Sequence, residues 1–304
     1  MKLVKRKIII VIFFVLICEI ILRVVWGFGN PVLYIEDKDF EYIYKPQQDV
    51  MRLGNHTYVN DFSMRSKPLS DKDKIRILKF GDSVINGGTI IDHNDLASTI
   101  LEDSLNKTLS GTRVLNISAG SWGPDNAFAY LKKFGNFDSK FFVLVFSSDD
   151  LSDIMDHRKI VGVDSFYPDK KPLLAITEIF SRYFVPWMYK KLGISVYNNK
   201  DVKHKRSIHT PKENPGFQLF FDYAKTNNIK LIMLLHPSVL ELQSHTYSQA
   251  GKRIIELCKE NNILCIEGIN YYDASFYSDG IHLNKLGHHK MAEILYPFLK
   301  SSIQ

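Results

Sequence analysis

Residues 75–83 read IRILKFGDS, an apolar run rich in β-branched side chains that ends in Gly81-Asp82-Ser83. Four further runs of this kind follow it: Arg113–Ile117, Phe141–Phe146, Ile229–Leu235 and Ile263–Glu267. Helical patterns cover Asp95–Leu109, Asp125–Phe134, Pro215–Asn227, Leu240–Asn261 and Lys285–Lys300. Continuously apolar strands that alternate with helices indicate a parallel sheet covered on both faces. We therefore predict a three-layer α/β/α domain with a five-stranded parallel sheet.

The N-terminal residues 1–28 have the pattern of a membrane anchor. Met1–Lys7 is basic, and Ile8–Phe28 is apolar apart from Glu19 and Arg23. As a helix this apolar run is about 31 Å long, enough to cross a hydrocarbon core of about 30 Å. Glu19 and Arg23 are one helical turn apart and are expected to pair. The basic end predicts a cytoplasmic N-terminus, with residues 29–304 outside the cytoplasm.

Two alternatives compete with an uncleaved single-pass anchor. A cleaved signal peptide would need a site of the small-x-small type after the apolar run, and none is evident. A buried helix of a soluble protein would not need the basic flank. The anchor is the favoured interpretation.

The charge of the chain is concentrated in this first segment. The 304 residues carry a formal net charge of +6, of which +4 lies in residues 1–28 and only +2 in the remainder. The nearly neutral remainder gives no reason to expect a nucleic-acid partner. With 45% hydrophobic and 24% charged residues, the chain has an ordinary globular composition, which excludes a disordered or disulfide-stapled protein.

Between the anchor and the first strand, residues 29–74 are polar and irregular, and we expect a stalk or cap. The domain proper is predicted over residues 75–304, with an insertion at 153–213. This insertion contains an aromatic stretch, Leu173–Leu192, expected to be helical, and a basic run, Asn198–Lys212. The aromatic side chains either bury one helix face, which we favour, or stack on sugars. Cys258 and Cys265 form either a disulfide or, as we favour, two separate thiols.

Polar residues follow the ends of the predicted strands, where the chemistry of parallel sheets gathers. Ser83 stands at a sharp strand-to-helix turn that can project its hydroxyl above the sheet. The other candidates are Asp82 beside it, Ser121, Trp122 and Gly123 after the second strand, Asp149 and Asp150 after the third, and His236 at the end of the fourth.

A second motif lies near the C-terminus, Asp279-Gly-Ile-His282. The spacing lets the carboxylate of Asp279 reach Nδ1 of His282 and fix the tautomer of the ring. Nε2 is then free to take a proton from a serine. Ser83, His282 and Asp279 are therefore predicted as a catalytic triad.

Together these blocks resemble the SGNH hydrolases, also called the GDSL esterase family, in a membrane-anchored form. Gly81-Asp82-Ser83 resembles the first block and Asp279-Gly-Ile-His282 the last, and Asn116 to Gly123 is similar to the second. Asn60-Asp-Phe-Ser-Met-Arg65 resembles an element that precedes the domain in anchored relatives. The resemblance spans about residues 60–300. It implies an SGNH, flavodoxin-like fold and a serine nucleophile at Ser83.

The resemblance also implies an oxyanion hole, and one residue departs from the pattern. The backbone N–H groups of Ser83 and of Ser121 or Gly123 are the expected donors. In the third block the family has Asn-Asp, whereas this chain has Asp149-Asp150. An ionised Asp149 cannot donate a hydrogen bond, and losing one oxyanion donor typically costs about 10²–10³ in rate. Asp82, Trp122, Asp150 and His236 are the expected substrate-binding residues.

The sequence thus predicts an extracytoplasmic, membrane-anchored serine esterase or O-acyltransferase. Its expected substrate is an O-acyl group, O-acetyl foremost, on a cell-envelope glycan or lipid-linked sugar. The alternative is a catalytically impaired SGNH-fold protein that binds glycans. A metal-dependent hydrolase using Asp82, Asp149, Asp150 and His236 has no metal-ligand spacing to support it. We expect no cofactor.

Overall fold

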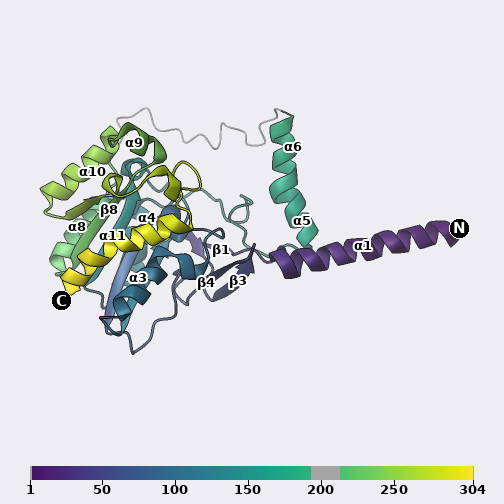
Figure 1. Ribbon diagram of the computed structural model, residues 1–304, viewed down its shortest axis with the longest axis horizontal. Coiled ribbons are helices and arrows are strands. Elements are labelled where there is room, and N and C mark those ends of the chain that lie inside the picture. Colours follow the sequence, from purple (N-terminus) through teal and green to yellow (C-terminus); the bar gives the residue numbers. More distant parts are fainter. Residues whose placement is uncertain (1, 193–212, 304) are drawn as a thin grey trace.

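The computed structural model describes residues 2–192 and 213–303 of the chain. Its central sheet has five parallel strands in the order β6-β5-β7-β8-β9, which confirms the predicted sheet (Figure 1). The strands are β5 (Ile75–Gly81), β6 (Thr112–Ser118), β7 (Phe141–Ser147), β8 (Lys230–His236) and β9 (Leu264–Glu267). The chain leaves β5 towards β6 and then crosses to β7 on the other side. The carboxyl end of β5 is therefore the topological switch point at which ligands bind in such sheets.

Helices cover both faces of this sheet, so the three-layer prediction is also confirmed. Alternate side chains of each strand point to opposite faces: Ile77 packs in one core cluster, and Leu78 and Phe80 in the other. The first cluster includes α3 (Ala97–Asn106) and α11 (Lys285–Ile303). The second includes α4 (Pro124–Phe134), α8 (Gly216–Thr226) and α10 (Gln249–Glu260).

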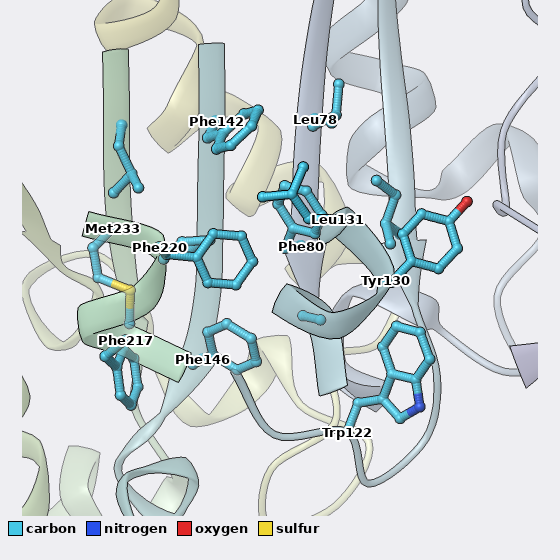
Figure 2. Close-up of a cluster of buried hydrophobic side chains, with 14 of the residues drawn as sticks. Leu78, Phe80, Trp122, Tyr130, Leu131, Phe142, Phe146, Phe217, Phe220 and Met233 are labelled. Atoms are coloured by element: carbon cyan, nitrogen blue, oxygen red, sulfur yellow. The ribbon is translucent and has the colours of Figure 1, made fainter. Parts of the chain in front are cut away.

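The second cluster is dominated by aromatic rings, and Figure 2 shows its centre. Phe80 of β5 packs edge-on against Phe142 of β7 at 5.3 Å between ring centroids and lies 4.9 Å from Phe220 of α8. Trp122 and Tyr130 extend the cluster toward the loop that follows β6. Buried apolar area of this kind contributes about 25 cal/mol per Å² to folding, so this layer fixes the strand ends that carry the site.

Lys79 is an exception within β5, because it is a fully buried lysine in the middle of this interior strand. Its Nζ lies 3.0 Å from Sδ of Met291 on α11. Burial lowers the pKa of Lys79 from 10.5 to about 7, because a charged ammonium loses its hydration in the core.

We expect Lys79→Met to raise the melting temperature of the protein at pH 7. The unfolded chain binds a proton at Lys79 up to pH 10.5, whereas the folded chain releases it near pH 7. Wild-type stability should therefore rise with pH across this window, by at most about 1.4 kcal/mol per pH unit. Thermal unfolding of both proteins in detergent at pH 7 and pH 9 measures this. A melting-temperature difference that is independent of pH would contradict the assignment.

One predicted helix is divided in the structure. Residues 240–261 form α9 (Val239–Ser244) and α10, separated by a turn in which His245 adopts a left-handed conformation with φ of 50°. Ser248 caps α10 by accepting from the N–H of Gly251 at 3.3 Å. The expectation of one continuous helix was wrong because this cap restarts the chain in a new direction.

Residues 29–74 were expected to be irregular but contain two antiparallel hairpins. These are β1 (Tyr34–Asp37) with β2 (Glu41–Tyr44), and β3 (Gln48–Arg52) with β4 (Asn55–Val59). Phe40, Tyr42 and Ile43 lie in the same core cluster as α4 and α8. The segment therefore packs onto the α/β domain as a cap.

Two helices project from this body. The first, α1 (Lys2–Trp26), contains one span, Val4–Trp26, that is long and apolar enough to cross a membrane. Only 6% of its most apolar stretch is buried against the rest of the protein. The second covers residues 175–191 as α5 (Ala175–Ile179), a π-helical turn (Phe180–Phe184) and α6 (Val185–Lys191), and we call it the α5–α6 helix. It confirms the predicted helix, whereas the basic run Asn198–Lys212 lies outside the described residues. Cys258 and Cys265 are free thiols.

Candidate active site

The turn after β5 holds Ser83 at the switch point of the sheet. Gly81 is required there, because a Cβ at this position would lie 2.5 Å from the carbonyl oxygen of Val145 on β7. Asp82 caps the short helix α2 (Ser83–Asn86) by accepting from the N–H of Val84 at 2.9 Å. Ser83 is thus the first residue of a helix, and its half-buried side chain stands above the strand end.

Two hydrogen bonds join Ser83, His282 and Asp279 in one chain. Oγ of Ser83 lies 2.9 Å from Nε2 of His282. Nδ1 of the same ring lies 2.8 Å from Oδ2 of Asp279. When the ring is neutral with its proton on Nδ1, it donates to the carboxylate and Nε2 accepts from the serine. Ser83 lies 199 positions before His282 in the sequence and Asp279 only 3, yet the three side chains meet at one point.

Asp279 is held in its ionised form by its own loop. Its Oδ1 accepts from the backbone N–H groups of Ile281 at 2.9 Å and His282 at 2.8 Å. Partial burial raises the pKa of Asp279, but these backbone hydrogen bonds and the His282 side chain outweigh it and lower the pKa to about 2. The carboxylate therefore stays charged at all pH values at which a histidine can act as a base.

A pocket of about 510 Å³ opens beside Ser83 and His282. Most of its lining is apolar or aromatic, and this part consists of Pro31, Val32, Tyr34, Tyr44, Leu53, Val84, Ile90, Phe166, Tyr167, Tyr183 and Leu283. Arg52 and Arg182 are the charged residues among its lining. Its walls come from the cap, from the α5–α6 helix and from the loop after α2.

Only some of the backbone N–H groups that could form the oxyanion hole lie near Ser83. Gly120 lines the pocket beside Ser83, and its carbonyl accepts from the hydroxyl of Tyr42 at 2.7 Å. The N–H of Gly123 donates to Oδ1 of Asn126 at 2.9 Å. Because this hydrogen bond already uses the N–H group, the prediction of Gly123 as an oxyanion donor was wrong. Ser121, with φ of 56°, is exposed next to Gly120.

Asp149 lies in the short 3₁₀ turn Ser148–Leu151, with an exposed side chain, and is not among the residues that line this pocket. The effect of its carboxylate on the oxyanion stays a prediction from the sequence.

Three predicted substrate-binding residues are buried and structural instead. Trp122 is fully buried and donates through Nε1 to the carbonyl of Tyr42 at 2.9 Å. Asp150 accepts from the N–H and the hydroxyl of Ser147, and burial together with Asp82 raises its pKa well above its usual value. A side chain without an exposed surface cannot contact a ligand in the pocket.

His236 is the third of these corrections. It is fully buried, and its Nε2 lies 2.8 Å from the carbonyl of Ile281, within the loop that carries Asp279 and His282. Burial lowers the pKa of His236 to about 4, so it is neutral and donates this hydrogen bond. His236 therefore holds the loop of the candidate triad in place.

Asp82 remains beside the serine, with Oδ2 at 3.5 Å from Oγ of Ser83. Burial raises its pKa to about 6. Within the described residues, no group of three or more histidine, cysteine or acidic side chains is placed to hold a metal ion.

No protein-family model matches the chain, and no curated protein sequence does. Solved structures are found at low identity. The crystal structure of TesA is 13% identical, with 74% of this chain and 98% of that chain covered and a TM-score of 0.46. A member of the lipolytic G-D-S-L family from Veillonella parvula DSM 2008 is 12% identical, with 73% and 97% covered and a TM-score of 0.42.

A third similar structure is a catalytic mutant of Axe2, an acetylxylan esterase from Geobacillus stearothermophilus. It is 14% identical, with 74% of this chain and 94% of that chain covered and a TM-score of 0.39. Because all three TM-scores lie below 0.5, the chemistry of this chain has to be derived from its own site.

Sequence reasoning assigned no role to Arg65, which holds a segment of the pocket lining in place. Arg65 is buried, and its guanidinium donates to the carbonyls of Asn86, Gly88 and Ile91 in the loop after α2. Burial lowers the pKa of Arg65 to about 10, which leaves it charged at neutral pH. The signal was present in the Asn60–Arg65 motif, whose Asn60 accepts from the N–H groups of Phe62 and Met64 and so fixes the turn before Arg65.

Proposed function

We propose that the chain is a serine-dependent esterase or O-acyltransferase of the SGNH hydrolase type. The observation that carries this proposal is the unbroken hydrogen-bond chain from Ser83 through His282 to Asp279, at 2.9 and 2.8 Å. The two distances lie within the range of a nucleophile, a base and an orienting carboxylate. Ser83 and His282 line a pocket that is large enough for a small ester.

In this mechanism Oγ of Ser83 attacks the acyl carbon while Nε2 of His282 takes its proton. His282 then returns the proton to the leaving alcohol, and an acyl-serine remains. Asp279 stabilises the charged ring without accepting its proton. The backbone N–H of Ser83 and one from residues 120–121 are the proposed oxyanion donors. Water as the second acceptor completes hydrolysis, and a sugar hydroxyl completes acyl transfer.

We also propose that α1 is an uncleaved anchor and that the domain faces the extracytoplasmic side. The support lies in contacts that a cleaved signal peptide would lose. Oε1 and Oε2 of Glu19 accept from the N–H groups of Ala175 at 2.7 Å and Ile176 at 3.1 Å. Glu19 also pairs with Arg23 at 2.6 Å, as the sequence predicts. These bonds cap the first turn of α5 from α1.

Full-length protein in detergent micelles, with p-nitrophenyl acetate as the ester, tests the activity. We expect release of p-nitrophenol in the presence of EDTA, because no step of the mechanism uses a metal. Addition of a sugar acceptor separates the two reactions: a transferase diverts the acetyl group to the sugar, detected as a mass increase of about 42 Da. Hydrolysis that EDTA abolishes would contradict the proposal, as would the absence of any turnover.

A further inference from the structure

The α5–α6 helix presents an aromatic stripe to the exterior. Phe180, Phe184 and Trp187 are 55%, 43% and 55% exposed. Their rings contact one another in series, with centroids 5.1 Å apart for the first pair and 5.8 Å for the second. Nζ of Lys191 lies 5.1 Å from the centre of the Trp187 ring. A helix face of aromatic rings bordered by lysine is typical of helices that lie in a membrane interface.

The opposite face of this helix is fixed to the cap, so the stripe cannot turn inward. Glu178 is buried and accepts from Nη2 of Arg52 at 2.5 Å and from the N–H of Gly29 at 2.6 Å. Arg182, one turn later, donates to the same carboxylate at 3.0 Å. Breaking a buried ion pair of this kind is strongly unfavourable. The helix is therefore held in one orientation about its axis.

The start of the helix is fixed to α1. Besides the two bonds from Glu19 to residues 175 and 176, Nη2 of Arg23 donates to the carbonyl of Leu173 at 2.7 Å. Figure 1 shows the α5–α6 helix standing crosswise to α1, near the end of α1 that joins the domain. A helix that crosses the direction of a membrane-spanning helix runs along the membrane surface.

The depth of this junction fits the interface. Glu19 precedes Trp26, the last residue of the span, by seven positions, or about 10 Å along the helix. Amphipathic helices bury their apolar face about 5–10 Å into the boundary between headgroups and acyl chains. Leu173 and Leu174, at 89% and 43% exposed, lie at the same junction and would enter the acyl region.

We propose that the α5–α6 helix lies in the membrane interface and opens the active-site pocket to a lipid-borne ester substrate. The position of the helix rests on the proposed anchor, and the second half of this statement rests on the proposed function. Arg182 and Tyr183 of this helix line the same pocket as Ser83 and His282. Leu53 and Phe166 add apolar lining beside them. An amphiphile held in the outer leaflet reaches the serine along this wall, with its acyl or polyprenyl chain remaining among the lipids.

Trp187 reports directly on the position of the helix. Full-length protein is reconstituted into phosphatidylcholine–phosphatidylglycerol vesicles that contain lipids brominated near the headgroup or near the chain end. The fluorescence of Trp187 is obtained as wild type minus Trp187→Phe, and Trp26→Phe gives the contribution of the anchor for comparison. We expect shallow bromines to quench Trp187 more than deep ones. Quenching by aqueous iodide alone, or by neither quencher because a protein covers the stripe, would overturn the proposal.

Substrate delivery is tested with two esters of the same leaving group. The triple variant Phe180→Ser, Phe184→Ser, Trp187→Ser should hydrolyse p-nitrophenyl acetate in water as fast as wild type. On p-nitrophenyl palmitate embedded in vesicles its rate should fall by about tenfold or more, because the pocket is no longer held at the interface. Leu240→Ser, which removes a 75% exposed leucine on α9, is the matched control.

If the triple variant loses the same fraction of its rate on both esters, or loses rate on neither, the proposal of a lipid-borne substrate would be overturned. Absence of turnover by wild type on either ester would instead count against the proposed function, while the quenching experiment still decides the position of the helix.

Discussion

Ser83→Ala should lower the rate of p-nitrophenyl acetate hydrolysis by the full-length protein by about 10⁴-fold or more. Oγ of Ser83 is the only atom in the proposed mechanism that forms a bond to the acyl carbon, and it is already 2.9 Å from the base that deprotonates it. Removing it leaves only a pocket and an oxyanion hole, which accelerate attack by water weakly. The measurement is initial rate at saturating ester, with wild type and variant in the same detergent.

Ser301→Ala is the matched control, because Ser301 is an exposed serine at the far end of α11. It should retain the wild-type rate. Ser83 is half-buried and belongs to none of the hydrophobic core clusters, so the folded state should survive the change, with a melting temperature within a few degrees of wild type. A Ser83→Ala rate within tenfold of wild type would remove the acyl-serine mechanism.

Asp279→Asn should lower kcat by about 10³–10⁴. The carboxylate, with its pKa near 2, is ionised at working pH and accepts a hydrogen bond from Nδ1–H of His282. An amide at this position can donate to Nδ1 instead, which moves the ring proton to Nε2. In that tautomer His282 cannot accept the proton of Ser83. The pH dependence should also change, because the charged ring loses its counter-ion.

Asp273→Asn serves as the control, since Asp273 is an exposed carboxylate shortly before Asp279 that accepts from the N–H of Ser275 at 2.8 Å. It should leave kcat within about twofold of wild type. The rates are measured from pH 5 to 9, and wild type should show no loss of activity from Asp279 above about pH 4, two units above its pKa. An Asp279→Asn protein that retains a tenth of wild-type kcat would contradict the role of Asp279.

The sheet and the candidate triad could both be predicted from the sequence for one physical reason. Parallel strands that are buried on both faces need continuous apolar runs, and their carboxyl ends meet at one edge. Ser83 and the loop at Asp279–His282 lie at that edge, within hydrogen-bond distance of each other. Two members of the candidate triad, Asp279 and His282, are only three residues apart in sequence. This pair can therefore be found without knowledge of the fold.

The rest of the site depends on side-chain direction, which strand position alone does not give. His236 and Trp122 also stand at strand ends, yet both point into the layers and are buried. Lys79 lies in an apolar strand, and the sequence gives no sign that its ammonium group is fully buried. The hairpin of β3 and β4 turns at Leu53-Gly54, where both φ angles are positive. Only the glycine of this pair is a sequence signal for such a turn, since Asn or Asp is preferred in the first position.

Covalent labelling of Ser83 tests the central claim most directly. A fluorophosphonate reacts with a serine only when a neighbouring base activates it, so it reports the working triad without requiring the natural substrate. Full-length protein in detergent is treated with the probe and the labelled peptide is identified by mass spectrometry. The mechanism predicts one phosphonate adduct, on Ser83, that is lost in His282→Ala. Protein that remains unlabelled at Ser83 under conditions that label a known serine esterase would contradict it and favour a glycan-binding protein without catalysis.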